Sequence, residues 1–514
     1  MKSVDDVIHQ SRYPEPLIPD TTLPEYVLAD AAARGDHPAL IDGITGQTLS
    51  YGELARRVPI VAARLASDGL HAGDVVAMIS PNQPAWAIAF FAVTTARAVV
   101  TAMNPQLTSR EITDHLRASG AVLVIADVRA TAARDAATVV GVRVLDITTL
   151  SMLDDSEDLH DTTEAEATES EAESVAVLAF SSGTTGLPKG VLLTHHNLVS
   201  SLCQHDGIYP MTSDDVVLAV LPFFHIFGMS VVLSYGLRHG ATIVTLPRFD
   251  LETYLTTIAT RRVTWLHLAP PLAHLLSNVD RNTDLSSVKY AMSGAAPLDA
   301  ATVTRLQERL GCAVGQGYGM TEASPGVTWV PNDATGPPAG SVGYLLPGTH
   351  ARIVDPGSGH DTDGPGELWI RGPQVMRGYL NDQEVTNATI DHDGWMRTGD
   401  IVRIDSAGVV WVVDRLKELI KYKGYQIAPA ELEALLRDHP LIDDAAVVGA
   451  PDPVAGEIPH AFVVRTDERL TEADVLAWCG DRVAPYKKPR IITFVDVIPR
   501  SATGKVLRRE LRAI

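Results

Sequence analysis

Residues 181–190, which read Ser-Ser-Gly-Thr-Thr-Gly-Leu-Pro-Lys-Gly, gather hydroxyl groups, glycines and one lysine in a single short stretch. Glycine lacks a Cβ atom, so consecutive backbone N–H groups can converge on an anion, and the hydroxyl groups add donors. Lys189 adds a positive charge. The stretch is not a Walker A loop, because no Gly-Lys-Ser/Thr sequence closes it. These residue types predict a polyphosphate site, with a Ser/Gly surface turn and an incidental lysine as the alternative.

The elements around this stretch predict an α/β fold. Residues 175–180 form an apolar run that indicates a buried strand leading into the polar loop. Capping boxes, Ser50 with Glu53 and Thr108 with Glu111, mark two helix starts. Alternating strands and helices favour parallel sheets with helices on their faces. The expected strands include 74–80, 99–103, 121–126, 216–220, 241–246, 263–268 and 288–292, and the expected helices include 86–97, 251–261 and 300–310.

A chain of 514 residues is too long for one hydrophobic core and predicts at least two domains. After about residue 335, Gly and Pro become dense, and runs such as 366–371 and 408–413 predict a β-rich subdomain. The last hundred residues mix strand, helix and hairpin patterns, as a small α+β unit would. We therefore expect a large N-terminal domain of layered parallel α/β subdomains plus the β-rich one, residues 1–416. A small mobile α+β C-terminal domain, residues 417–514, would follow it.

Charge and composition limit the classes of partner. The formal charge is −21, but residues 154–174 hold ten carboxylates and no Lys or Arg, which leaves −11 (−21 less −10) for the rest. The acidic run is typical of a solvated loop. The remaining negative charge disfavours nucleic-acid binding.

Cysteine usage and hydropathy indicate a cytoplasmic protein. The three cysteines are widely separated and predict neither a disulfide framework nor a zinc site. The first residues lack the apolar core of a signal peptide, and the last three are no peroxisomal address. The most hydrophobic stretch, 86–100, is too short to span a bilayer. We expect no stable membrane association, and a monomer or homodimer.

Six further stretches are also rich in glycine or turn-forming residues and carry a few polar groups. They are residues 222–228, 292–298, 315–322, 394–400, 414–426 and 499–505. With 181–190, these seven stretches resemble, in order and spacing, the signature motifs of the adenylate-forming superfamily, which includes acyl-CoA synthetases, adenylation domains and luciferases. Residues 317–323 and 421–433 are most similar to those of 4-coumarate–CoA ligase-like enzymes.

This resemblance implies an ATP-dependent reaction in two halves. A carboxylate would attack the α-phosphorus of MgATP, releasing pyrophosphate, and coenzyme A thiolate would then displace AMP. Neither half demands a protein nucleophile, so positioning and charge stabilisation would carry the catalysis.

For the first half-reaction, the resemblance makes Lys505 the lysine that bridges the carboxylate and the α-phosphate. It makes Glu322 the Mg²⁺ ligand, in keeping with the preference of that ion for oxygen. His225 would be the gate between the acyl pocket and the CoA channel. The implied contacts to ATP come from Ser181, Ser182, Gly183, Thr184, Thr185, Gly186, Lys189, Gly294, Gln316, Gly317, Tyr318, Thr321, Asp400 and Arg415.

For the second half-reaction, Lys421 and Gln426 would contact the acyl-adenylate. Lys423 and Gly424 would meet CoA, and Arg248 stands where relatives carry a basic residue for the CoA nucleotide. Lys421 and Lys505 would use one site in turn, with the C-terminal domain rotating about a hinge at Lys417.

The acyl pocket departs from the pattern of the plant coumarate ligases. Phe227 and Val231 lie one helical turn apart, where the plant enzymes carry a tyrosine and a serine suited to a phenol. Neither residue here offers a hydrogen bond, which predicts apolar aryl or medium-chain acids above 4-coumarate, and no amino acid. The expected pocket residues are Phe224, Phe227, Val231, Gly294, Gly315, Ala323, Ser324 and Pro325.

Other readings stay open. The acyl acceptor could be an amine or a carrier-protein thiol, and luciferase-like chemistry shares the same residues. A non-catalytic nucleotide-binding protein on the same scaffold is disfavoured, because Lys505, Glu322, Asp400 and His225 are all retained.

Overall fold

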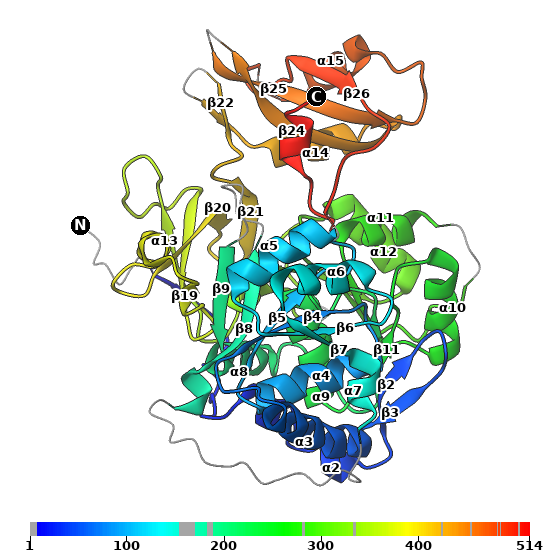
Figure 1. Cartoon of the computed structure of the whole chain (residues 1–514). Coiled ribbons are helices and arrows are strands. Elements are labelled where there is room, and N and C mark those ends of the chain that lie inside the picture. Colours follow the sequence, from blue (N-terminus) through cyan, green and yellow to red (C-terminus); the bar gives the residue numbers. More distant parts are fainter. Residues whose placement is uncertain are drawn as a thin grey trace.

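The computed structural model describes residues 8–153, 170–181, 189–279, 283–332, 336–422, 425–452, 455–480, 482–483, 485–501 and 504–514. Most of the acidic run and the centre of the phosphate loop, residues 182–188, lie outside the described residues. The described chain forms a large domain with two α/β layers and a β-rich subdomain, and a small domain stands above it (Figure 1). The predicted fold class is confirmed.

The first α/β layer is a sheet ordered β19-β9-β8-β5-β4-β6-β7. Successive side chains of a strand point to opposite faces, so Val76 and Met78 pack with α3 and α4, while Ala77 and Ile79 pack with α5 and α6. Strands β4 to β8 are parallel, and β9 returns antiparallel to β8. The strands are β4 (Val75–Ile79), β5 (Val99–Met103), β6 (Leu123–Ala126), β7 (Arg143–Asp146), β8 (Val175–Ser181), β9 (Lys189–Thr194) and β19 (Gly378–Tyr379).

Both predicted capping boxes are present on this layer, and they begin α3 and α5. Helix α4 is buried along its whole length from Ala85 to Thr94, because it lies between the two α/β layers and is apolar all round. The helices are α3 (Tyr51–Ser67), α4 (Pro84–Thr95), α5 (Ser109–Ser119), α6 (Thr131–Val140) and α7 (Ile147–Ser151).

The second layer is a sheet ordered β16-β15-β14-β13-β12-β10-β11-β2-β3, parallel from β14 to β2 with antiparallel edges. One face packs on α10, α11 and α12, and the other joins the core shared with the first layer. The strands are β2 (Pro38–Asp42), β3 (Thr48–Ser50), β10 (Val216–Ala219), β11 (Thr242–Thr245), β12 (Trp265–Leu268), β13 (Tyr290–Ser293), β14 (Ala313–Gly319), β15 (Gly326–Trp329) and β16 (Tyr344–Leu345).

One helical segment of this layer is a π-helix, η3 (Phe227–Ser234), which directly follows His225 and Ile226. Such wide turns are rare and occur frequently at functional sites. The remaining helices of the large domain, apart from α13, are α1 (Leu23–Leu28), α2 (Ala31–Arg34), η2 (Glu171–Glu173), α8 (His195–His205), α9 (Tyr235–Arg238), α10 (Leu251–Arg261), α11 (Pro270–Asn278), α12 (Ala300–Leu310) and η4 (Thr321–Ala323).

The β-rich subdomain is an antiparallel sheet ordered β1-β17-β18-β20-β21, with α13 beside it, as the sequence predicts. Its elements are β1 (His9–Gln10), β17 (His350–Val354), β18 (Gly366–Arg371), α13 (Gln383–Thr389), β20 (Met396–Ile404) and β21 (Val410–Arg415).

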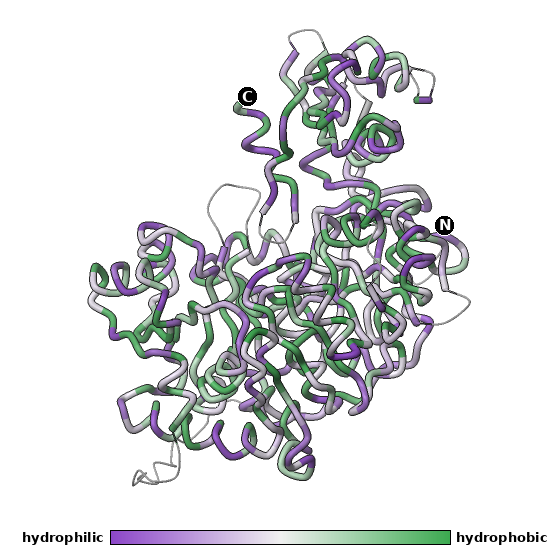
Figure 2. Tube along the Cα trace, turned by 90° about the vertical axis from the view of Figure 1, so that its right-hand side faces the viewer, coloured by the Kyte–Doolittle hydropathy of each residue, from purple (hydrophilic) through white to green (hydrophobic). Residues whose placement is uncertain are grey.

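The small domain has its own core around Ile420, Leu432 and Val463. Its tail comes back down to the large domain near α11 (Figure 1). Hydrophobic segments concentrate inside both domains (Figure 2), and no helix among the described residues is long and apolar enough to cross a membrane. The elements are β22 (Ile420–Tyr422), β23 (Tyr425–Ile427), α14 (Pro429–Arg437), β24 (Ile442–Asp452), β25 (Gly456–Arg465), α15 (Glu472–Gly480), β26 (Ile491–Phe494) and α16 (Arg508–Leu511).

Candidate active site

A cavity of about 710 Å³ opens where strands β8, β13 and β14 end and where the tail of the small domain meets the large one. Carboxyl ends of parallel strands are the usual place for a ligand in an α/β fold. Its charged lining residues are Lys189, Arg397, Arg415, Lys417, Lys505, Glu322 and Glu367. Five cations against two anions give an excess of positive charge, as a triphosphate requires.

Three predicted nucleotide-binding residues form one hydrogen-bonded group. Tyr318 OH donates to Asp400 Oδ2 at 2.6 Å, and Arg415 Nε lies 3.1 Å from Asp400 Oδ1. Strands β20 and β21 bring Asp400 and Arg415 directly opposite each other. Burial and the neighbouring Asp400 carboxylate raise the pKa of Tyr318 well above its usual value. Asp400 is 3% exposed, and a carboxylate can accept more hydrogen bonds than these two, which its predicted role with the ribose hydroxyls would need.

Glu322, on η4, is one of the two carboxylates that line the cavity. Its Oε1 accepts from Ser181 Oγ and from Tyr379 OH, both at 3.1 Å. Lys189 Nζ lies 4.9 Å from the centre of the Tyr379 ring. One carboxylate beside hydroxyl groups and a lysine fits Mg²⁺, which proteins hold through one or two carboxylates while phosphates and water complete the shell. The described residues contain no cluster of three or more His, Cys, Asp or Glu that would form a cage for the ion.

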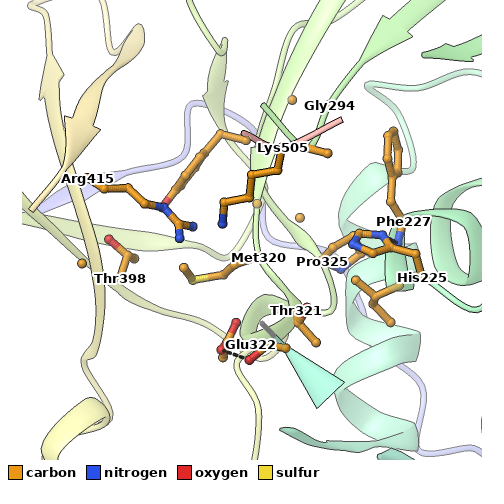
Figure 3. Close-up of a pocket in the computed structure, with 18 of the residues that line it drawn as sticks. His225, Phe227, Gly294, Met320, Thr321, Glu322, Pro325, Thr398, Arg415 and Lys505 are labelled. Atoms are coloured by element: carbon orange, nitrogen blue, oxygen red, sulfur yellow. Dashed lines mark hydrogen bonds between the residues drawn. The ribbon is translucent and has the colours of Figure 1, made fainter. Parts of the chain in front are cut away.

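Lys505 reaches the cavity from a tight loop of the small domain. The Lys505 N–H donates to Ser501 Oγ, and Ser501 N–H donates to the Lys505 carbonyl oxygen. Gly504 has a φ of +82°, and a Cβ on it would lie 2.8 Å from Pro271 Cδ at the start of α11. The turn and the close approach both require glycine. Lys505 and Arg415 extend into the same part of the cavity, above Thr321 and Glu322 (Figure 3).

The charge of Lys505 sets an expected pH dependence. Burial, and then the Arg415 guanidinium, lower the pKa of Lys505 to about 8. The ammonium form is present below that pH, so kcat/KM of the free enzyme for ATP should fall as the pH rises through about 8. Pyrophosphate exchange measured from pH 6 to 9.5 checks this, with thiolysis of supplied acyl-AMP as the control that should lack the step. A flat exchange profile to pH 9.5 would contradict it.

His225 is fixed in one neutral form. Its Nδ1 accepts from the Phe227 N–H at 3.2 Å, which leaves the ring proton on Nε2. Burial, and then the nearby Lys505 charge, lower the pKa of His225 to about 4. In this conformation the ring is therefore a neutral donor above pH 5, and it adds no ionisation to the pH profile expected for Lys505.

One wall of the cavity, where the sequence predicts the acyl pocket, is apolar. Phe227 and Val231 both line it, from η3 rather than from an α-helix. Gly294 and Pro325 line it as well, and a Cβ on Gly294 would lie 2.9 Å from Phe227 Cε1. A larger residue at position 294 would therefore push the Phe227 ring out of place.

Several predicted site residues do not line this cavity. Gln316 holds the backbone of Leu298 through two hydrogen bonds, of 2.9 and 3.0 Å. Gly315 faces the hydroxyl of Tyr290, where no Cβ would fit. Phe224, Ala323, Ser324, Asp400, Arg248 and Lys421 also lie off the lining, and Arg248 and Lys421 are exposed. The roles given to these residues stay predictions.

Other predicted residues lie outside what the structure describes. They are Ser182, Gly183, Thr184, Thr185 and Gly186 of the phosphate loop, with Lys423 and Gly424. Gln426 is described as part of β23, where its backbone pairs with that of Lys421.

The structure also adds residues that sequence reasoning missed. Tyr379 contacts both Glu322 and Lys189, and Met292 and Trp329 line the cavity. Arg397 lies on the lining and stacks over the Trp369 ring. Met292 and Arg397 fall within the glycine-rich stretches 292–298 and 394–400 and could have been found there, whereas Tyr379 and Trp329 belong to none of the seven stretches.

Comparisons with known proteins agree with this geometry. A model of the AMP-binding enzyme family matches residues 28–380, and a model of the AMP-binding enzyme C-terminal domain matches residues 431–505. A 4-coumarate–CoA ligase of Vanilla planifolia is 41% identical over 531 residues, covering 99% of this chain and 96% of the relative. 4-Coumarate–CoA ligase 2 of Oryza sativa subsp. japonica is 43% identical over 547 residues, covering 98% and 95%.

Solved structures show the same architecture. ATP-bound MatB of Rhodopseudomonas palustris has a TM-score of 0.86 at 29% identity, and the match covers 96% of this chain and 99% of that one. O-succinylbenzoate coenzyme A synthetase of Bacillus subtilis, in complex with AMP, has a TM-score of 0.83 at 28% identity, with coverage of 96% and 98%.

Fold, site and relatives together define an AMP-forming acid–CoA ligase, which uses ATP and Mg²⁺ to join a carboxylic acid to coenzyme A through an acyl-AMP intermediate. The chain belongs to the AMP-binding enzyme family, and its full-length similarity to 4-coumarate–CoA ligases confirms the resemblance noted from its motifs.

Proposed function

We propose that this ligase activates apolar carboxylic acids, namely aryl acids of the cinnamate type or medium-chain fatty acids. One observation carries the proposal: Lys505 shares a cavity with Glu322 and with the apolar wall of Phe227 and Val231. A carboxylate bound at the end of that wall would lie close to the Lys505 ammonium. The α-phosphate of an ATP molecule bound at the Tyr318–Asp400 pair would lie near the same ammonium.

The residues take the following roles in the first half-reaction. A carboxylate oxygen forms a bond to the α-phosphorus, and the bond from that phosphorus to the bridging oxygen of pyrophosphate breaks. Lys505 and Thr321 stabilise the charge that develops on the α-phosphate oxygens. Glu322 would hold Mg²⁺, which neutralises the phosphate charge, and Lys189 anchors the leaving pyrophosphate. His225 donates its Nε2–H toward the carboxylate.

In the second half-reaction the CoA sulfur bonds to the acyl carbon and AMP leaves with the bonding electrons of its oxygen. We propose that residues 417–514 then turn about Lys417, so that Lys421 and Gln426 replace Lys505, with Lys423 and Gly424 at CoA. The position of Lys421 supports this, because it lies exposed on the same small domain that delivers Lys505.

The composition of the pocket wall predicts a substrate preference. Because neither Phe227 nor Val231 can pair with a phenol, kcat/KM for cinnamate should equal or exceed that for 4-coumarate. Thioester formation with both acids, followed in parallel, measures the ratio. A preference for 4-coumarate by more than about tenfold, about 1.4 kcal/mol, would contradict the argument. The pair Phe227→Tyr with Val231→Ser should shift the ratio toward 4-coumarate.

The test of the function is pyrophosphate release over a panel of carboxylic acids, with and without CoA, with the product identified by mass. Release together with a thioester of an apolar acid is expected. Release without any thioester would instead favour an amine or carrier-protein acceptor, and no release with any acid would favour a non-catalytic nucleotide-binding protein.

We also propose a cytoplasmic location. The substrates ATP and CoA support it, and so do Cys203, Cys312 and Cys479, which are all free. Fractionation of the native host, with the protein detected by antibody, tests this, and recovery in a sealed organelle would contradict it.

A further inference from the structure

Asp414 is a buried carboxylate at the junction of the two domains, to which the reaction described above gives no role. It belongs to β21 in the sheet of the large domain and is 7% exposed. Its Oδ1 accepts from the Arg415 N–H at 2.6 Å, and its Oδ2 accepts from the Ala430 N–H at 2.9 Å. The first bond holds the chain that carries the Arg415 guanidinium, and the second reaches into the small domain.

The second bond supplies a helix cap. Ala430 is the second residue of α14, and the N-cap residue of that helix, Ala428, has no side chain that could cap it. A carboxylate suits this position, because it accepts from an otherwise unpaired N–H and complements the helix dipole. The first helix of the small domain is therefore capped by a strand of the large domain.

Further charges connect this cap with the catalytic loop. Arg508, which attracts the Asp414 carboxylate, pairs with Glu433 at 2.6 Å and lies 3.7 Å from Glu418. Arg508 begins α16, three residues after Lys505. The partners of Arg508 stand on α14 and on the chain just after Lys417, so α14, the junction and the Lys505 loop form one connected unit.

Burial of Asp414 also limits how strongly its carboxylate stabilises the start of α14. It raises the pKa of Asp414 to about 6, because the loss of water costs the carboxylate more than the two N–H donors and Arg508 return. At pH 7.5 the group is still ionised and keeps both acceptor oxygens. A weakly stabilised hydrogen bond between Asp414 and Ala430 suits a small domain that must also rotate away from this orientation.

We propose that Asp414 is a positioning residue for acyl-AMP formation: by capping α14 across the domain junction, it favours the orientation of the small domain that places Lys505 in the cavity. This inference rests on the proposed function. Rotation about Lys417 separates Asp414 from Ala430, because the two lie on opposite sides of that residue, so the cap exists in only one of the two working orientations.

The test compares both half-reactions in Asp414→Ala and Asp414→Asn at pH 7.5. Pyrophosphate exchange should fall about tenfold in the alanine variant, because the Ala430 N–H, which the cap satisfies only in the orientation shown, loses its acceptor. Thiolysis of supplied acyl-AMP should stay within about twofold or rise. The asparagine variant, which keeps one acceptor oxygen, should recover part of the exchange rate. Asp443→Ala, which removes an exposed carboxylate of β24, is the matched control and should change neither rate.

Equal loss in both half-reactions would show a merely structural role, and undiminished exchange in Asp414→Ala would remove the cap from the mechanism. Either result overturns the inference. The wild-type protein separates this failure from that of the proposed function: if wild type itself exchanges no pyrophosphate with any apolar acid, the proposed function fails, whereas exchange in wild type and the alanine variant alike refutes only the role of Asp414.

Discussion

Replacement of Lys505 by alanine is expected to slow acyl-AMP formation by about 10²- to 10³-fold while thioester formation from supplied acyl-AMP stays within about threefold of wild type. Lys505 is a cation that the small domain adds to the cavity, beside Arg415 and above Glu322 (Figure 3). Its ammonium group is held by a loop that packs on Pro271, so it needs no reorganisation when charge develops on the α-phosphate. In the proposed mechanism the second half-reaction does not use this group, which is why the effect should be confined to the first.

Single-turnover measurements separate the two steps, with pyrophosphate release reporting the first and CoA thioester reporting the second. Lys487→Ala is the matched control, because it removes a lysine of the same domain whose Nζ lies 2.7 Å from Glu431 on the surface. That variant should keep both rates. A loss of equal size in both half-reactions of Lys505→Ala would refute the division of work between Lys505 and Lys421.

Local patterns predicted the regular elements well where both ends of an element are marked in the sequence. Helix α12 runs over 300–310 as predicted, because Asp299 caps its start and Gly311 adopts the left-handed conformation after its end. Strands β5 and β18 also have the predicted bounds. The long C-terminal strands β24 and β25, which pair over most of their length, appear in the sequence only as general strand and hairpin patterns.

Features that depend on distant contacts were not predictable in the same way. Apolar periodicity does not separate the π-helix η3 from an α-helix over eight residues, although it did place Phe227 and Val231 on one wall. Tyr379 contacts Glu322 across 57 residues of chain without any local pattern. The motif at 315–322 illustrates a further limit: Gly317 and Tyr318 line the cavity, whereas Gln316, between two glycines of the same stretch, turns toward Leu298.

A second substitution with a large expected effect on activity lies at the junction of the domains. Lys417 stands there between one residue that is bonded to the large domain and one that is bonded to the small domain. The Leu416 N–H donates to Gly399 of the large domain at 2.8 Å. On the other side of Lys417, the Glu418 carboxylate lies 3.1 Å from Arg512 of the small domain. Any change of orientation between these anchors must therefore pass through the backbone torsions at and near Lys417.

Lys417→Pro should consequently retain acyl-AMP formation and lose thioester formation by about 100-fold, the size of effect that a misplacement of about 1 Å has on a reacting pair. The proline ring fixes φ near −65°, so the proposed rotation that would present Lys421 is blocked, whereas acyl-AMP formation needs no rotation away from the orientation shown. The same single-turnover measurements check this result. Lys417→Ala is the control, since it removes the same side chain and leaves the backbone free, and it should keep thioester formation within about threefold. If the alanine and proline variants lost thioester formation equally, the side chain and not the hinge would be responsible; if the proline variant formed thioester at the wild-type rate, the small domain would not need to rotate about this residue at all.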